Sequence, residues 1–203
     1  KRSDQVLIES KLTEEKERCR KAIKLAEEGI KVALISSGES GFYGMAGLLL
    51  ELLQKIKKEY RPYFEVHPGI SSVQLAAALS GAPLMNDFCS ISLSDKLTPW
   101  SVIEKRIKGA LFGDFVMALF NPQSIERKWQ LKSIINICLK FRHRDTPVLL
   151  ARQVGRENQS KKFFTLSTIP FKEIDMLSII IIGNSQTKLV DEIFLTPRGY
   201  LQN

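Results

Sequence analysis

The sequence predicts an α/β protein built from two domains. Short apolar runs alternate with amphipathic stretches of helical period, which is typical of strands and helices that follow one another. Turns rich in glycine, proline and serine come directly after several of the apolar runs, where the strands of an open sheet end. The last apolar runs, from residue 161 onward, leave little room for helices between them, which indicates a mixed sheet with antiparallel members.

The first half contains three helices and two strands in alternation. Cys19, Ile23 and Ala26 fall on one face of a helix that Thr13 starts and Gly29 ends. The basic end of the second helix suits a helix C-terminus. The predicted elements are a helix over 13–28, a buried strand over 31–36, a helix over 44–59, a strand over 63–66 and a small-residue helix from about 72 to 81.

The second half repeats the alternation and then changes to strands alone. Thr98 and Pro99 open its first helix, since proline is favoured at the first helical position. The predicted elements are strands over 89–94, 114–120 and 147–154, helices over 98–112 and 125–142, and three further strands in KKFFTLST, SIIIIGN and EIFLTP. The junction lies between Leu84 and Phe88, which predicts domains over 1–86 and 87–203.

Composition narrows the classes of partner. The chain has 203 residues and a formal net charge of +8, which suits an anionic partner: nucleic acid, an acidic membrane surface or a polyanionic small molecule. The alternative is that the charge reflects only a surface rich in lysine. Nucleic acid is disfavoured because the aromatic residues are not interleaved with a basic stripe. The longest apolar run, LSIIIIG at 177–183, suits a buried strand and predicts no membrane span.

Three cysteines and two histidines lie far apart and never at the spacing of metal ligands. This pattern predicts a reduced, intracellular and cytoplasmic protein without a structural metal. No signal peptide is visible in the sequence.

Four turns are candidates for ligand loops: SSGESGFYG, HPGISS, LFNPQS and IIGNSQT. The first is no phosphate loop, because no GKS or GKT follows and Glu39 would repel phosphate. A carboxylate beside exposed backbone amides suits hydroxyls, an amine or a cation, although a tight turn alone would also explain it. Taken alone, Ser71 is better explained by helix capping than by a ligand contact, and Asn121 before proline is also explained by a turn. Arg152 and Arg156 are either solvated or a clamp for carboxylates.

These segments, taken in order, resemble the tetrapyrrole (corrin/porphyrin) methylase family. ISSGESGFYGMAG, HPGISSVQLAAALSGAPLMNDF, ISLSDKLTPWSVIEKRI, ALFNPQS and IIIGNSQT…TPRGY carry the resemblance, which runs from about Lys11 to Tyr200. Within the family the chain is most similar to the branch that methylates C-17 of precorrin-3B or of its cobalt-bearing counterpart. ISLSDKLTPW and GNSQT are the most specific segments.

The resemblance implies two α/β domains with S-adenosylmethionine bound in a cleft between them. The substrate would be an anionic corrin precursor with several carboxylates. The reaction would place a methyl group on C-17 with ring contraction, in cobalamin (vitamin B12) biosynthesis. The resemblance also implies a homodimer. Two alternatives stay open: a methylase of the same fold acting on another tetrapyrrole carbon, and a binding module without catalysis.

The resemblance assigns the cofactor contacts, and the chemistry of the implied substrate suggests the other site residues. Asp95 is the candidate acid or base for the ring contraction, unless it only orders the turn before Thr98. Arg152 and Arg156 are the candidates for substrate carboxylates. The cofactor contacts fall on Gly38, Glu39, Ser40, Phe42, Ser71, Ser72, Asn121 and Val154.

Two departures from the family pattern affect the expected site. Glu39 and Ser40 replace the usual Asp-Pro pair, so a longer acid must fit in a less rigid turn. The family's first strand, with its own glycine-proline loop, is absent from this sequence, so the expected site lacks that loop unless it is supplied from elsewhere.

Overall fold

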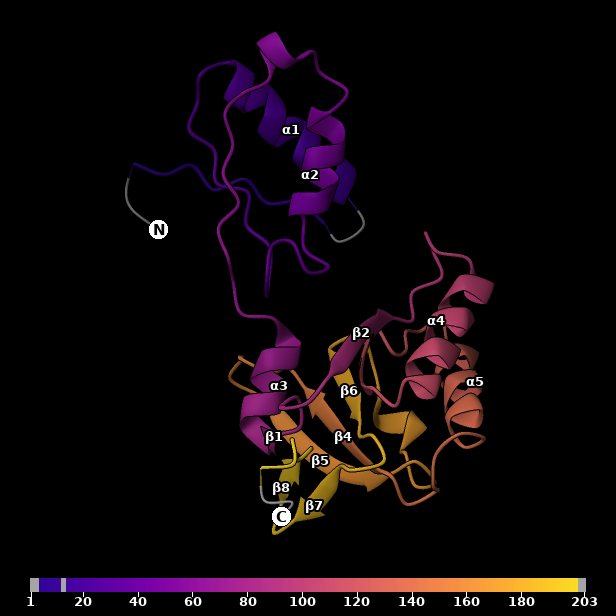
Figure 1. Cartoon of the computed structure of the whole chain (residues 1–203). Coiled ribbons are helices and arrows are strands. Elements are labelled where there is room, and N and C mark those ends of the chain that lie inside the picture. The colour runs from indigo at the N-terminus through magenta and orange to yellow at the C-terminus, as the bar shows by residue number, and fades with distance from the viewer. Residues whose placement is uncertain (1–3, 12–13, 201–203) are drawn as a thin grey trace. The chain divides into compact units, whose positions relative to one another are not determined.

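The computed structural model describes residues 4–11 and 14–200 (Figure 1). The chain forms two compact units, Lys1–Ser71 and Ser72–Asn203. This partition differs from the predicted domains over 1–86 and 87–203 in assigning residues 72–86 to the second unit. The reason is that helix α3, Ser72–Ser80, contacts strands of the second unit. The two-domain division at 86/87 remains a prediction.

The regular secondary structure in the described part of the first unit is helical. It contains helix α1 (Glu15–Glu27), helix α2 (Ala46–Leu53) and a short 3-10 helix, η1 (Lys58–Tyr60). The two α-helices lie side by side. Cys19 and Ile23 are buried on α1 as the helical period predicts, and Leu53 is buried on α2. Thr13, the predicted start of α1, lies outside the described residues.

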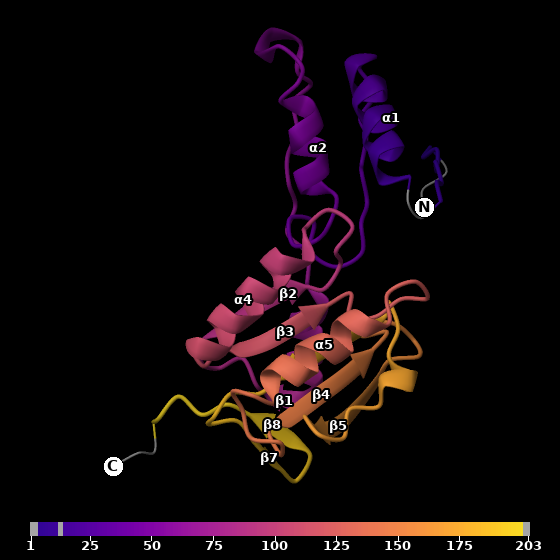
Figure 2. The same ribbon diagram turned by 90° about the vertical axis from the view of Figure 1, so that its right-hand side faces the viewer.

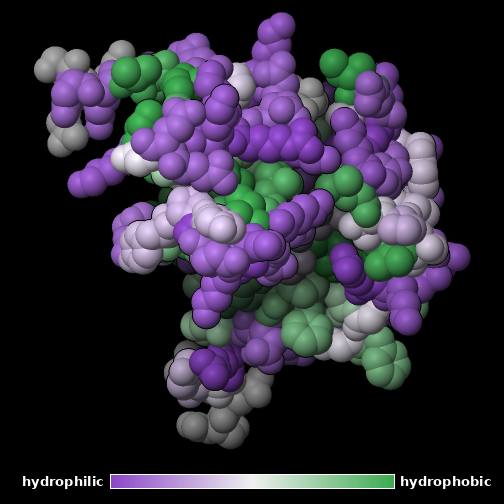
Figure 3. Space-filling view, turned by 90° about the horizontal axis from the view of Figure 1, so that it is seen from above, coloured by the Kyte–Doolittle hydropathy of each residue, from purple (hydrophilic) through white to green (hydrophobic). Residues whose placement is uncertain are grey.

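Two strands predicted in this unit are wrong. Residues 31–36 and 63–66 are extended but belong to no strand, and Figure 2 shows them as long traces beside the helices. A strand needs a ladder of hydrogen bonds to a neighbour, and the described residues of the unit supply none to either segment. Their apolar side chains are therefore open to solvent: Ile35 is 77% exposed and Tyr63 is 85% exposed. Figure 3 shows exposed hydrophobic side chains among hydrophilic ones on one face of the molecule.

The second unit contains the predicted mixed sheet. Its five strands stand in the order β2-β3-β6-β4-β5, and β2, β3 and β4 run in one direction while β6 and β5 run in the other. A small second sheet has the order β1-β8-β7. The strands are β1 Gly81–Ala82, β2 Phe88–Ser92, β3 Val116–Phe120, β4 Pro147–Arg152, β5 Ser160–Thr165, β6 Ser178–Ile182, β7 Lys188–Val190 and β8 Ile193–Leu195.

Helices cover both faces of the five-stranded sheet. Helices α4 (Trp100–Phe112) and α5 (Trp129–Cys138) lie on one face and α3 on the other (Figure 1). The sequence predicts Pro99 as the first helical residue, whereas in the structure Pro99 is the N-cap of α4 and Trp100 is the first residue of the helix. The core beneath α4 and α5 takes alternate residues of the central strands, such as Leu119 and Ile180, because successive side chains of a strand point to opposite faces. A short 3-10 helix, η2 (Phe171–Glu173), precedes β6.

Strand direction decides which loops meet. The carboxyl ends of β2, β3 and β4 lie at one edge of the sheet, together with the beginnings of β5 and β6. The loop IIGNSQT follows β6, and it therefore lies at the opposite edge: Gly183 N–H donates to Pro147 O at 2.9 Å, and Ser185 N–H donates to Asp114 at 3.1 Å. IIGNSQT is a candidate ligand loop from the sequence, but it does not share an edge of the sheet with LFNPQS, because β6 is antiparallel to its neighbours.

Among the described residues, no helix combines the length and the apolar character that crossing a membrane requires.

Candidate active site

Three loops of the second unit leave the sheet at the carboxyl ends of β2, β3 and β4. Asp95 lies in the first, Asn121 in the second, and Val154 with Arg156 in the third, while Arg152 is the last residue of β4. The structure thus brings these five predicted residues to one edge of the sheet, where open α/β sheets bind ligands.

The start of α3 reaches this edge too. A side chain added at Gly155 would lie 2.8 Å from the Leu75 side chain, so the loop after β4 packs closely on the first turns of the helix. Ser72 is the first residue of α3 and therefore belongs to this part of the second unit. Ser71 is the last residue of the first unit and is buried.

Two of the strand exits hold strained backbone. Asn121, directly after β3, has φ 49°, and Gln153, directly after β4, has φ 50°. Both lie in the left-handed region, which asparagine tolerates better than glutamine does. The side chain of Asn121 donates to Ser92 Oγ at 2.9 Å, and Gln153 N–H donates to Leu177 O at 3.0 Å. Such strain persists where surrounding contacts hold it and concentrates at functional sites.

Asp95 is held by a residue that the sequence analysis did not select. Gln130, on α5, donates from Nε2 to Asp95 Oδ2 at 3.0 Å. Gln130 is only 2% exposed, and its Oε1 has no hydrogen-bond partner among the described residues. The sequence contains a signal for Gln130. It lies four residues before Ile134, on the apolar stripe of α5, where a polar side chain is buried and therefore needs a hydrogen-bond partner.

Arg127 is a second residue that the sequence analysis missed. It is 6% exposed and donates from Nη1 to Leu93 O at 3.1 Å and to Asn121 O at 3.0 Å. It therefore ties the exit of β2 to the exit of β3. Nothing in the segment IERKW indicates burial, since a run of charged residues is usually a solvated face.

The two predicted clamp arginines lie in different environments. Arg152 forms an ion pair with Asp175, to which its Nη2 and Nε both donate. Desolvation raises the pKa of Asp175, but the hydrogen bonds from Arg152 and Ser178 outweigh it and hold that pKa below its ordinary value. Arg156 is exposed and forms no ion pair with any other described residue. Arg156 is thus open to an external carboxylate, whereas Arg152 has an internal one.

Apolar side chains stand beside this polar edge. Leu97, in the loop after β2, is 98% exposed, and Ile125, in the loop after β3, is 91% exposed. Trp100 and Trp129 meet edge to face with ring centroids 4.7 Å apart. The loops therefore offer an apolar surface next to the buried polar groups, the combination that binding sites for organic ligands require.

The first unit brings two of the predicted loops together. Ser40 Oγ donates to His67 O at 2.7 Å. A side chain at Gly69 would lie 2.1 Å from Gly38 O, so glycine is needed there for the close approach. Gly38 has φ +79°, and a side chain at this position would meet only Ile70 O at 3.8 Å, which leaves open space over the loop. Glu39 is half-buried beside this space.

Phe42 completes the loop of the first unit. Its ring stacks on that of Tyr43 with centroids 5.1 Å apart. Tyr43 has φ 60°, a left-handed conformation that is unusual for an aromatic residue. The loop therefore combines a carboxylate, a hydroxyl, an uncovered stretch of backbone and an aromatic ring. This set of groups suits an amine, ribose hydroxyls and a nucleobase, and it fits S-adenosylmethionine.

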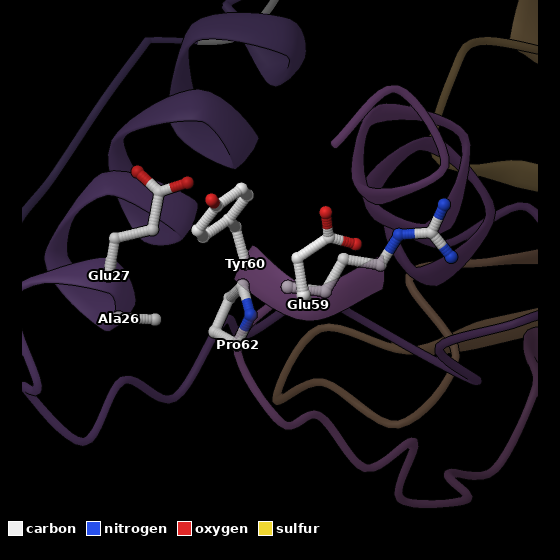
Figure 4. A pocket seen from close by; sticks show the side chains of 6 residues that line it. Ala26, Glu27, Glu59, Tyr60 and Pro62 are labelled. Atoms are coloured by element: carbon white, nitrogen blue, oxygen red, sulfur yellow. The ribbon is translucent and has the colours of Figure 1, made fainter. Parts of the chain in front are cut away.

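Two surface hollows among the described residues hold no predicted site residue. One of about 420 Å³ lies between the end of α1 and η1, and Figure 4 shows the carboxylates of Glu27 and Glu59 there, beside Tyr60. Another of about 330 Å³ lies at the opposite edge of the large sheet, near Arg142 and Asn184. Among the described residues, no group of three or more histidine, cysteine and acidic side chains is placed to hold a metal ion.

Comparisons with known proteins agree with this architecture. The family of tetrapyrrole (corrin/porphyrin) methylases matches residues 3–170. The chain is 45% identical over 197 residues to the probable cobalt-factor III C(17)-methyltransferase of Salmonella typhimurium, and the match covers 97% of this chain and 81% of that protein. It is 46% identical over 200 residues to the cobalt-factor III methyltransferase of Priestia megaterium, covering 98% of this chain but 37% of that protein.

A solved structure shows the same fold. The crystal structure of the methyltransferase CobJ has a TM-score of 0.91 and 34% sequence identity, covering 97% of this chain and 82% of the other. The α/β architecture predicted from the sequence is confirmed. The chain spans less than half the length of the P. megaterium relative and about four-fifths of CobJ and of the Salmonella relative.

Proposed function

Because the chain belongs to the tetrapyrrole (corrin/porphyrin) methylase family, we propose that it methylates C-17 of precorrin-3B or its cobalt-bearing counterpart, with ring contraction, in cobalamin biosynthesis. The observation that carries this proposal is the 45% identity, over 97% of the chain, to the probable cobalt-factor III C(17)-methyltransferase of Salmonella typhimurium. The fold shared with the methyltransferase CobJ supports the same assignment.

Tetrapyrrole methylases use S-adenosylmethionine. When bound, this cofactor supplies a methyl group on a positively charged sulfur, ready for a carbon nucleophile. We propose that it is held by Gly38, Glu39, Ser40, Phe42, Ser71, Ser72, Asn121 and Val154. Glu39 accepts hydrogen bonds from its amine or hydroxyls, and Phe42 contributes an apolar wall. The open backbone at Gly38 supports this assignment, since a ligand can approach it closely.

The residues of the second unit then orient the macrocycle and exclude water. Arg156, exposed and unpaired among the described residues, binds a substrate carboxylate. Arg152 also binds one, in exchange for Asp175. Asp95 accepts or returns a proton during ring contraction, and the hydrogen bond from Gln130 fixes its orientation.

A methyl-transfer assay tests the proposal. The protein is incubated with S-adenosylmethionine carrying a labelled methyl group and with the cobalt-bearing or cobalt-free C-17 substrate, and the product is located by carbon NMR. Label on C-17 is the expected result. Label on another carbon would instead support a methylase with a different ring position. Cofactor binding by calorimetry without any transfer would support a non-catalytic binding module.

We propose further that the protein works in the cytoplasm as a homodimer. The support is the dimeric state suggested by the family resemblance and the three cysteines, Cys19, Cys89 and Cys138, which are free thiols in the structure. Sedimentation equilibrium gives the oligomeric state directly. A single species of monomer mass at micromolar concentration would exclude the dimer.

A further inference from the structure

Arg127 carries a permanent positive charge at a buried position. An arginine does not lose its proton inside a protein, so burying it is costly unless an anion compensates the charge. Arg127 is 6% exposed, yet no carboxylate of the described residues forms an ion pair with it. Its contacts are two carbonyl oxygens and one thioether sulfur. The charge is therefore only partly compensated.

One edge of the guanidinium remains available for a ligand. Both protons of Nη1 are used, one on Leu93 O and one on Asn121 O. The Nε atom is buried and has no hydrogen-bond partner among the described residues. The Nε–H and Nη2–H groups form one edge of the guanidinium fork, and this edge matches the two oxygens of a carboxylate.

A movable side chain covers this edge. Nη2 of Arg127 donates to Met176 Sδ at 3.1 Å. A thioether is a weak acceptor, and methionine is unbranched and adapts its conformation easily. Met176 is 48% exposed, so its side chain can turn into solvent. A carboxylate that displaces Met176 would give Arg127 Nη2 a charged acceptor in place of a weak, uncharged one.

We propose that Arg127 binds a carboxylate of the substrate through Nε–H and Nη2–H after Met176 moves aside. The inference rests on the proposed function, because the macrocycle supplies the carboxylate. The position agrees: Arg127 lies between the exits of β2 and β3, and Gln130, one turn further along the chain, holds Asp95. The substrate carboxylate thereby anchors the macrocycle beside the candidate acid or base.

The alternative is that Arg127 only ties the two loops together. Arg142 provides a matched control for that role. Its side chain is 4% exposed, and it donates to the carbonyls of Gly183 and Phe115 at the opposite edge of the sheet, but it is paired with Asp114. A purely structural effect of changing a buried arginine should appear both when Arg127 is replaced by lysine and when Arg142 is.

The test measures binding of uroporphyrin, a tetrapyrrole that carries carboxylates around its ring, by quenching of tryptophan fluorescence at low ionic strength. Arg127→Lys keeps the charge and loses the two-point geometry, so we expect its affinity to fall about tenfold or more. Arg142→Lys should lower the melting temperature and leave the affinity unchanged. Met176→Ala uncovers the fork and should tighten binding, which a structural role would not do.

The outcomes separate this inference from the proposed function. Equal affinities in the wild-type and both Arg127→Lys and Met176→Ala proteins would overturn the carboxylate site, as would a wild-type protein that does not bind uroporphyrin. Binding that depends on Arg127, in a protein that transfers no methyl group, would keep the carboxylate site and refute the methyltransferase. Methyl transfer with a Michaelis constant unchanged by Arg127→Lys would keep the methyltransferase and refute the carboxylate site.

Discussion

At the scale of single residues, charges that look alike in the sequence differ in what they can bind. Arg152 and Arg156 flank the exit of the predicted strand over 147–154, and nothing in the sequence separates their roles. The structure separates them through Asp175, which lies between η2 and β6 and, of these two arginines, pairs with Arg152 alone. Their substitutions should therefore have different consequences.

We expect Arg152→Gln to lower both stability and substrate affinity, and Arg156→Gln to lower affinity alone. The first change leaves Asp175 without its partner, which costs up to about 1 kcal/mol because the pair is partly exposed. The second removes an exposed side chain, so the free energy of unfolding should stay within about 0.5 kcal/mol of the wild-type value. Urea denaturation and steady-state kinetics give both quantities. A Michaelis constant unchanged in Arg156→Gln would remove it from the site.

The ion pair also predicts a pH dependence of stability. The pKa of Asp175 is lower in the folded protein than its ordinary value, so the pair stabilises the fold above the unfolded pKa of about 3.9. That contribution is lost as the pH falls through the lower, folded pKa. The difference in unfolding free energy between wild type and Asp175→Asn should be largest near neutral pH and shrink below about pH 4. A difference that is constant down to acid pH would show that the charge of Asp175 contributes nothing.

At the scale of elements, the sequence predicted helices better than it predicted strands. The helical period of α4 and α5 is a local property, and their buried faces are where that period places them. Gln130 lies on such a face, so its burial could be predicted from the sequence. Strands depend on partners. The pattern of residues 31–36 favours a buried strand, but no local pattern says whether a neighbour is present. The sequence indicates antiparallel strands among the last apolar runs but does not say which ones, and the direction of β6 decides where GNSQT lies.

We expect hydrogen exchange to distinguish paired from unpaired extended segments. The amides of 31–36 and 63–66 make no ladder bonds in the described structure and should exchange quickly. The amides of β3 and β6, central in the large sheet, should be among the slowest. Exchange followed by mass spectrometry of peptides resolves the two classes. Strong protection of 31–36 would mean that another strand pairs with it.

The loop after β6 should matter for stability and not for catalysis. Thr187 Oγ1 accepts from Asn184 N–H at 2.8 Å and lies 2.8 Å from Thr196 Oγ1, and all three residues are buried. Thr187→Val leaves a buried N–H unpaired, which should cost about 1–3 kcal/mol in unfolding free energy. Thr187→Ser keeps the hydroxyl and is the matched control. Because the loop lies across the sheet from Asp95, turnover at a temperature where both variants are folded should stay unchanged. A turnover defect in Thr187→Val alone would bring this loop back into the site.

At the scale of the whole molecule, the family and its fold could be predicted from the sequence, whereas much of the site could not. Motifs such as ISLSDKLTPW are continuous in the chain, and so the resemblance that they carry survived comparison with the structure. The burial and contacts of Arg127 could be recognised only from the structure, in which it bonds to carbonyls at the exits of both β2 and β3. Its carbonyl contacts join residues far apart in the chain, which no segment read alone contains.

Net charge is the property of the whole chain that can be tested without choosing a residue. The formal charge of +8 should attract a substrate with several carboxylates, and dissolved salt should screen that attraction. We expect the Michaelis constant for the tetrapyrrole to rise as ionic strength increases from about 0.05 to about 0.5 M, where the screening length falls well below about 10 Å. Turnover at saturating substrate should change little, because bound groups are screened less. S-adenosylmethionine is the internal control: it bears no net negative charge, so its Michaelis constant should not rise in parallel. Equal responses of the two constants would mean that salt perturbs the protein as a whole and that the positive charge does not select the polyanion.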